Sequence, residues 1–73
     1  MTLLEFLEKT DMTQREMARR LDVSQPTVTK WVRGRFIPTM PNLIRITEVT
    51  DGLVRYDDFV RVKQQAGQTE KVL

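Results

Sequence analysis

The stretch TQREMARRLDVSQPTVTKWVRG, residues 13–34, decides the fold of this 73-residue chain. It holds two apolar patterns of helical spacing, separated by a break of three residues. Thr13 and Glu16 fit a capping box at the start of the first pattern. Ser24 is a good N-cap for the second, with Pro26 in the first turn, where a missing amide hydrogen costs nothing. We therefore expect two short helices joined by a tight turn.

Two helices joined by so short a break must cross steeply, and the sequence meets the packing demands of such a crossing. Ala18 provides a small residue where the helices come closest, and Val23 provides an apolar plug for the turn. Val28 supplies a buried branched residue five positions later, and Leu21 closes the same core. Trp31 lies one turn beyond Val28 on the same face, so we expect it in the core.

Helical patterns continue on both sides of this unit. Residues 2–9 form an amphipathic helix that Thr2 can cap. Gly34 is expected in the left-handed conformation that closes the helix before it. Thr39 can cap a fourth helix that runs to about Thr50. Its inward side chains are expected to be Leu43, Ile46 and either Thr47 or Thr50.

The last third of the chain leaves two interpretations open. A fifth helix from Tyr56 to Gln65 is favoured because Asp57 and Asp58 suit the first turn of a helix. The alternative is a C-terminal β-hairpin, since Val54 and its neighbours also suit strands. The expected fold is thus all-α with five helices, or α+β with that hairpin. Residues 1–65 would be one domain, with 66–73 a flexible tail.

Charge is unevenly distributed along the chain. The net charge is +2, yet residues 13–45 alone carry +5 and the remainder carries −3. A positively charged central segment between acidic ends would create an electrostatic field that attracts one polyanionic partner. An ordinary solvated surface would explain the same charges equally well. No apolar run approaches the roughly 20 residues of a membrane helix, and no signal peptide is recognisable. We expect a cytoplasmic protein with no membrane partner.

Composition also bounds the chemistry. The chain has no cysteine and no histidine. This removes disulfides, thiolate metal ligands, the commonest general base and every triad built on imidazole. Neither the hydroxyl side chains nor the scattered acids form a catalytic or metal-binding cluster. We expect no enzyme, no cofactor, no metal site and no small-molecule ligand.

The segment resembles the helix-turn-helix of the phage Cro and repressor (XRE-like) family. The resemblance runs to about Gly52 and is carried by these positions: Gln14, Ala18, Leu21, Val23, Ser24, Val28, Trp31 and Gly34. The family usually has glycine where this chain has Asp22, because that residue adopts positive φ. Aspartate is among the few other residues that tolerate this conformation.

The resemblance implies that the start of the third helix enters the major groove of double-stranded DNA. The base-reading residues would be Ser24, Gln25, Pro26, Thr29 and Lys30. Gln25 could bind adenine N6 and N7 together, whereas the Thr29 methyl and the Pro26 ring could pack on a thymine methyl. The phosphate-binding residues would be Thr13, Gln14, Arg15, Thr27, Arg33, Arg35 and Asn42.

The leading function is a Cro-like transcription repressor. One recognition helix reads too few base pairs for selectivity in a genome, so a homodimer on an inverted repeat is expected. Pairing would use Leu53 to Val60, or else Phe36, Ile37 and Met40. An antitoxin or accessory DNA-binding subunit with a protein partner is the alternative. A third class is an adaptor that uses the same fold only for protein contact.

Overall fold

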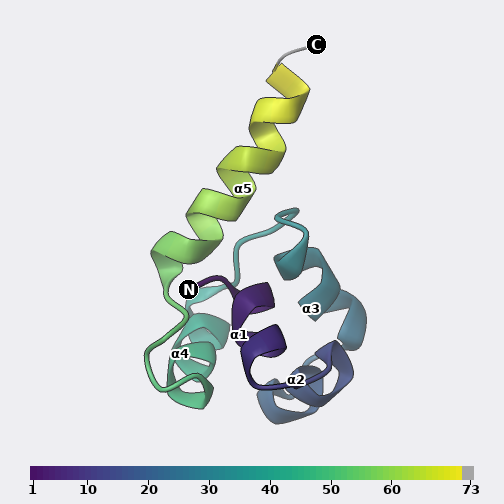
Figure 1. Cartoon of the computed structure of the whole chain (residues 1–73), viewed down its shortest axis with the longest axis vertical. Coiled ribbons are helices and arrows are strands. Elements are labelled where there is room, and N and C mark those ends of the chain that lie inside the picture. Colours follow the sequence, from purple (N-terminus) through teal and green to yellow (C-terminus); the bar gives the residue numbers. More distant parts are fainter. Residues whose placement is uncertain (72–73) are drawn as a thin grey trace.

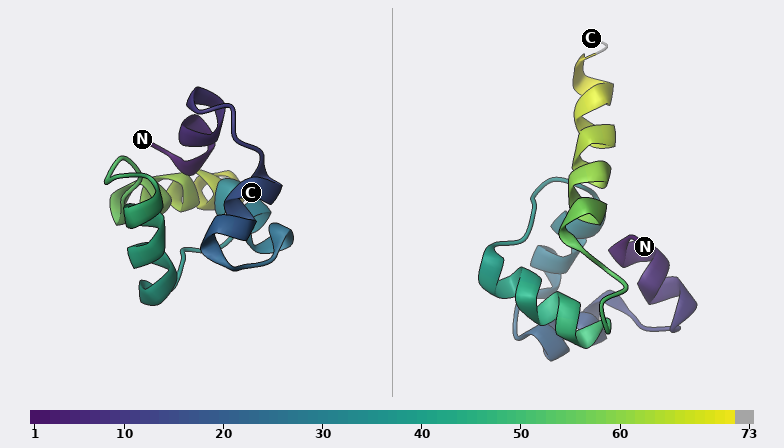
Figure 2. Two further views of the ribbon diagram at one scale, coloured as in Figure 1. Left: turned by 90° about the horizontal axis from the view of Figure 1, so that it is seen from below. Right: turned by 90° about the vertical axis from the view of Figure 1, so that its left-hand side faces the viewer.

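The computed structural model describes the backbone of residues 1–71 and the side chains of residues 1–65. The chain forms five helices, with no strand in this described part: α1 (Leu3–Lys9), α2 (Gln14–Leu21), α3 (Gln25–Val32), α4 (Met40–Val49) and α5 (Tyr56–Lys71). The first four form a body, and α5 rises from it (Figure 1). The right-hand view of Figure 2 shows that α5 begins at this body and that its C-terminal part extends beyond the other helices. The predicted all-α fold is confirmed, and the hairpin alternative is wrong.

Each helix contributes apolar side chains to one core. Helix α2 packs on α3 and on α4, and α1 packs on α3. The buried apolar residues are Leu3, Phe6, Leu7, Met17, Ala18, Leu21, Val28, Trp31, Leu43, Ile46, Val54 and Phe59. Ala18, Val28 and Trp31 are therefore where their spacing predicted, and Val23 packs half-buried against the same core. Trp31 is 4 % exposed, so its surface is used in the core.

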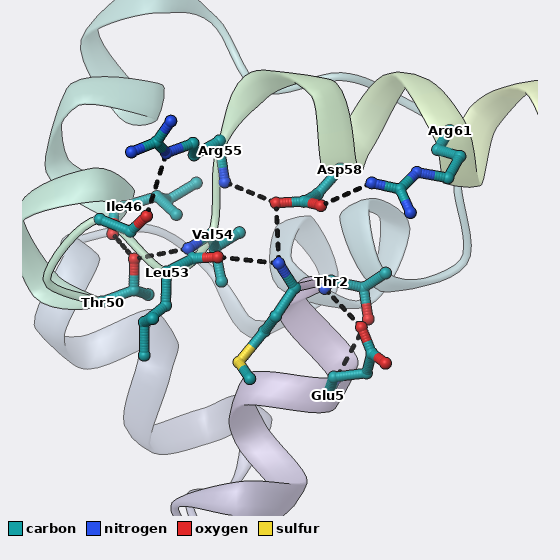
Figure 3. A network of polar contacts seen from close by, with 11 residues as sticks. Thr2, Glu5, Ile46, Thr50, Leu53, Val54, Arg55, Asp58 and Arg61 are labelled. Atoms are coloured by element: carbon teal, nitrogen blue, oxygen red, sulfur yellow. Dashed lines mark hydrogen bonds and ion pairs between the residues drawn. The ribbon is translucent and has the colours of Figure 1, made fainter.

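The start of α1 has a complete capping box. The Glu5 amide donates to Thr2 Oγ1 at 3.1 Å, and the Thr2 amide donates to Glu5 Oε1 at 2.7 Å (Figure 3). The Thr2 amide holds the pKa of the Glu5 carboxyl below its usual value, because the bond favours the ionised form. The expected Thr2 cap is thus present.

The capping box predicted for α2 is only half formed. Thr13 Oγ1 accepts from the Glu16 amide at 3.1 Å, as expected. The Glu16 carboxylate, however, lies 3.5 Å from Arg19 and 3.4 Å from Arg20. It pairs with these arginines along the helix instead of returning to the Thr13 amide, so the reciprocal half of the prediction is wrong.

The next two helices also begin at the predicted caps. Ser24 Oγ accepts from the Thr27 amide at 3.3 Å and starts α3. Thr39 occupies the N-cap of α4, but its side chain makes no capping hydrogen bond. The position of Thr39 was predicted correctly and its capping bond was not. Thr50, the C-cap residue of α4, is the inward threonine, since it is buried and Thr47 is exposed.

A left-handed residue ends each of the first four helices. The φ angles are 56° at Asp11, 57° at Asp22, 77° at Gly34 and 54° at Asp51. After α2 the Asp22 amide donates to the Arg19 carbonyl at 3.2 Å, and the next amide donates to the Ala18 carbonyl at 3.0 Å. This is the Schellman pattern, which satisfies the last carbonyls of a helix. The positive φ expected at Asp22 and at Gly34 is confirmed.

Replacing Asp22 with glycine should raise the free energy of unfolding by about 1 kcal/mol, because glycine adopts this φ without steric cost and removes a negative charge from a helix C-terminus. Urea unfolding followed by circular dichroism measures the change. Asp22→Ala is the matched control, since it removes the charge but keeps Cβ. An equal gain in both variants would show that charge, not backbone strain, limits stability at this turn.

A buried carboxylate fixes the start of α5. Asp58 is 6 % exposed and accepts from the Arg55 amide at 2.9 Å, from Arg61 Nη2 at 3.2 Å and from the Met1 ammonium at 3.2 Å. The Met1 ammonium also donates to the Leu53 carbonyl at 2.9 Å. Figure 3 shows this network around Asp58. It ties the first turn of α5 to the beginning of the chain.

Helix α5 is longer than predicted. It was expected to end at Gln65, and it continues to Lys71. The predicted flexibility of residues 66–73 stays a prediction, and its last two residues lie outside the described part. Across the part that the structure describes, none of the helices has the length and apolar character needed to cross a membrane.

Candidate nucleic-acid interface

An open hollow of about 510 Å³ runs along the exposed side of α3 and into the loop after it. Its lining residues are Gln25, Pro26, Thr29, Lys30, Arg33 and Arg35. Four of the five predicted base readers and two predicted phosphate contacts therefore share one surface. Among the described residues, this lining has three cations and no carboxylate, which suits a polyanion.

Gln25 and Lys30 both line this hollow, but they differ in the contacts that their side chains already make. Gln25 is the first residue of α3, and among the described residues its exposed amide has no hydrogen-bond partner. Its donor and acceptor are thus both available to a ligand. Lys30 Nζ lies 5.5 Å from the centroid of the Phe36 ring, a cation–π contact. Phe36 is 56 % exposed, and sequence reasoning had assigned it only to a possible pairing surface.

Ser24 differs from the other predicted base readers. It is exposed but does not line the hollow. Its hydroxyl accepts from the Thr27 amide and lies 2.7 Å from Thr27 Oγ1. Ser24 is therefore engaged in capping α3, and its base-reading role stays a prediction.

A second hollow, of about 310 Å³, adjoins the first and shares Lys30 with it. Here Thr27 from α3 meets Thr39 and Asn42 from the start of α4. Two predicted phosphate contacts, Thr27 and Asn42, are thus brought together across two helices. Small polar side chains beside one ammonium group are suitable donors for a phosphate oxygen.

The remaining predicted phosphate contacts lie around the start of α2. Thr13 and Gln14 line a third hollow, which also includes the acidic residues Glu8 and Asp11. Arg15 is exposed and lines none of these three hollows. Gln14 is joined to the hollow along α3, because Thr29 Oγ1 donates to Gln14 Oε1 at 2.6 Å. The two residues are fifteen positions apart, and no local sequence pattern signals this bond.

Three further contacts position the interface and were missed from the sequence. Arg45 Nη1 donates to the Leu21 carbonyl at 3.2 Å and so secures the C-terminal end of α2. Lys63 Nζ of α5 donates to the Arg35 carbonyl at 3.4 Å. Gly34 lies so close to α5 that a Cβ at this position would be 2.8 Å from the Val62 carbonyl oxygen. Helix α5 thus supports the loop that presents Arg35.

Comparison with known proteins agrees with this geometry. The family model described as Helix-turn-helix matches residues 3–53, which include all of α1–α4. An uncharacterized HTH-type transcriptional regulator of Haemophilus influenzae is 32 % identical over 56 residues, 77 % of this chain but only 23 % of that protein. A search of solved structures gave no significant match. Because the family match covers well over half of the chain, the protein belongs to the helix-turn-helix family of DNA-binding regulatory domains.

Proposed function

We propose that this chain is a sequence-specific transcription repressor of the Cro type, which reads double-stranded DNA in the major groove through α3. The observation that carries the proposal is the hollow along α3. Among the described residues, the Gln25 amide there has no hydrogen-bond partner, and the lining has three cations and no carboxylate. An α-helix fits the major groove, and its outward side chains reach the base edges there. The similarity to an HTH-type transcriptional regulator supports the regulatory part of the proposal.

Different residues would make the contacts with bases and the contacts with phosphates. Gln25 would bind adenine through its paired donor and acceptor, with Pro26 and the Thr29 methyl against thymine. Lys30 would reach guanine or an adjacent phosphate. The phosphate contacts would come from the edges of α3 and from the starts of α2 and α4. Base contacts then give specificity, whereas phosphate contacts give position and affinity.

A homodimer on an inverted repeat completes the proposal, since one α3 reads too few base pairs. Of the pairing segment proposed from the sequence, Leu53 and Tyr56 are 46 % and 51 % exposed, whereas Phe59 is buried. Pairing through this segment would thus rest on Leu53 and Tyr56. The second candidate surface has Phe36 and Met40, which are 56 % and 65 % exposed.

Selection of bound sites from random double-stranded DNA tests the function. We expect a motif with two-fold symmetry whose half-sites lie about one helical turn apart. Salt-dependent binding without any motif would contradict sequence-specific regulation. Absence of binding at low salt would contradict a nucleic-acid role altogether and favour protein contact.

Arg33→Ala should weaken binding to every sequence alike and flatten the slope of log K against log salt by about one unit, because one phosphate contact releases about one counterion. Titrations at several salt concentrations measure the slope. Arg20→Ala is the control: it removes the same charge from an arginine already paired with Glu16. An unchanged slope for Arg33→Ala would exclude a phosphate contact at Arg33.

A further inference from the structure

One side-chain hydrogen bond links the two helices of the DNA-binding unit at the proposed interface. Thr29 Oγ1, on the fifth residue of α3, donates to Oε1 of Gln14, the first residue of α2, over 2.6 Å. Both side chains are half-buried, so solvent competes for this bond less than at an open surface. Thr29 also lines the hollow along α3, so one end of the bond lies at the base-reading surface.

The bond limits what Thr29 can offer to DNA. A threonine hydroxyl has one proton to donate and two lone pairs that accept. Thr29 donates its hydroxyl proton in the bond to Gln14. On the side of the hollow it can therefore only accept a hydrogen bond or make an apolar contact through its methyl group. Gln14 uses one lone pair of its Oε1 in this bond, and its Nε2 amine remains as a donor of the kind that a phosphate oxygen accepts.

We propose that Gln14 is a positioning residue for specificity, which acts by fixing the polarity of Thr29. With its proton held by Gln14, Thr29 accepts from an exocyclic amine in the major groove, adenine N6 or cytosine N4. Guanine O6 or thymine O4 at the same place would set two acceptors against each other. Gln14 Nε2 would keep the phosphate contact that the proposed function already gives to the start of α2. This inference rests on the proposed major-groove function.

Without Gln14 the hydroxyl would rotate freely and could donate to a base as well as accept from one. Loss of Gln14 should therefore relax base preference at a position that Gln14 never touches. A residue that only bound phosphate would weaken all sequences alike. A residue that only held α2 against α3 would lower stability and leave the base preference of the folded protein unchanged. The proposed role is thus separable from both.

Site selection with the full chain and a set of matched variants tests this inference. The wild type should prefer an exocyclic amine over a carbonyl oxygen at the base facing Thr29 by about tenfold, the effect of one unsatisfied acceptor. Gln14→Ala should reduce this preference to about twofold or less. Gln14→Glu can still accept the Thr29 proton but lacks the amine, so it should keep the base preference and bind every site more weakly.

Two substitutions of Thr29 complete the set. Thr29→Ser keeps the hydroxyl and should keep the amine preference, whereas Thr29→Val keeps the methyl groups and should lose it. Circular dichroism shows whether each variant is folded, so that base preferences are compared only between folded proteins. If the wild type selects a motif and Gln14→Ala leaves its base preferences unchanged, the positioning role is refuted and the proposed function stands. If the wild type selects no motif, both proposals fail.

Discussion

Gly34→Ala should lower the free energy of unfolding by about 3 kcal/mol, which combines the cost of a left-handed alanine with the cost of overpacking. Gly34 has φ +77°, a conformation that L side chains rarely adopt. A Cβ there would lie 2.8 Å from both Val62 Cγ1 and the Val62 carbonyl oxygen. The valine side chain could move, but the backbone oxygen can give way only if α5 shifts. A domain of this size has about 3–5 kcal/mol to lose, so the variant should be largely unfolded at physiological temperature.

Gly52→Ala separates the two contributions, because Gly52 has φ +79° but nothing lies within 4 Å of a Cβ built there. This control should lose only about 1 kcal/mol, the conformational cost alone. Thermal and urea unfolding of both variants measure the difference. Adding Val62→Ala to Gly34→Ala should restore part of the loss, since one of the two contacts disappears. Equal losses at Gly34 and Gly52 would show that the close approach of α5 has no energetic consequence.

The order and type of the helices were predictable because their signals are local. Caps such as Ser24 act within three residues, and the left-handed residue Asp22 is defined by its own backbone. The apolar spacing of Ala18, Val23 and Val28 describes a crossing within one continuous segment. Such features depend on neighbours in sequence, so a sequence alone contains them.

Two kinds of contact could not be predicted from the sequence. In one, several partners compete for the same side chain, and in the other, the two residues are far apart in the sequence. Glu16 had a backbone amide and two arginines within reach, and local pattern does not say which partner wins. The contact between Gly34 and Val62 spans 28 positions, and that between Met1 and Asp58 spans 57. These contacts form only after the helices have packed. They also explain why the last third of the chain was ambiguous, because α5 begins where Asp58 is held.

The sequence was enough to predict which residues share the exposed side of α3, but not the hydrogen bonds among them. Lining residues follow from helical periodicity on α3, so Gln25, Pro26, Thr29 and Lys30 were placed together correctly. The state of each side chain does not follow from periodicity. The Ser24 hydroxyl caps α3, and the Thr29 hydroxyl donates its hydrogen bond to Gln14. Two members of one predicted group therefore have fewer hydrogen bonds to offer DNA than their residue types suggested.

Gln25→Ala should reduce discrimination at one or two base pairs of each half-site by 1–3 kcal/mol, about 5- to 150-fold, and leave non-specific affinity nearly unchanged. Gln25 is exposed at the first position of α3, and its amide has no partner among the described residues. No internal bond is lost on truncation, so any change in binding reports a contact with DNA. Competition titrations with the selected site and with single-base variants measure the discrimination.

Two further variants test whether Gln25 contacts a base directly: Gln25→Glu, which should change the preferred base, and Gln64→Ala, which is the control. Glutamate has the shape of glutamine but only accepts, so preference at the contacted pair should move from adenine toward cytosine, whose N4 amine donates. Gln64 is also exposed but lies on α5, outside the α2–α3 unit, so its truncation should leave every base preference intact. A uniform loss across all sequences in Gln25→Ala would assign Gln25 to the phosphate backbone. A loss confined to one or two base pairs, with the shift toward cytosine in the glutamate variant, is what a direct contact between Gln25 and a base edge requires.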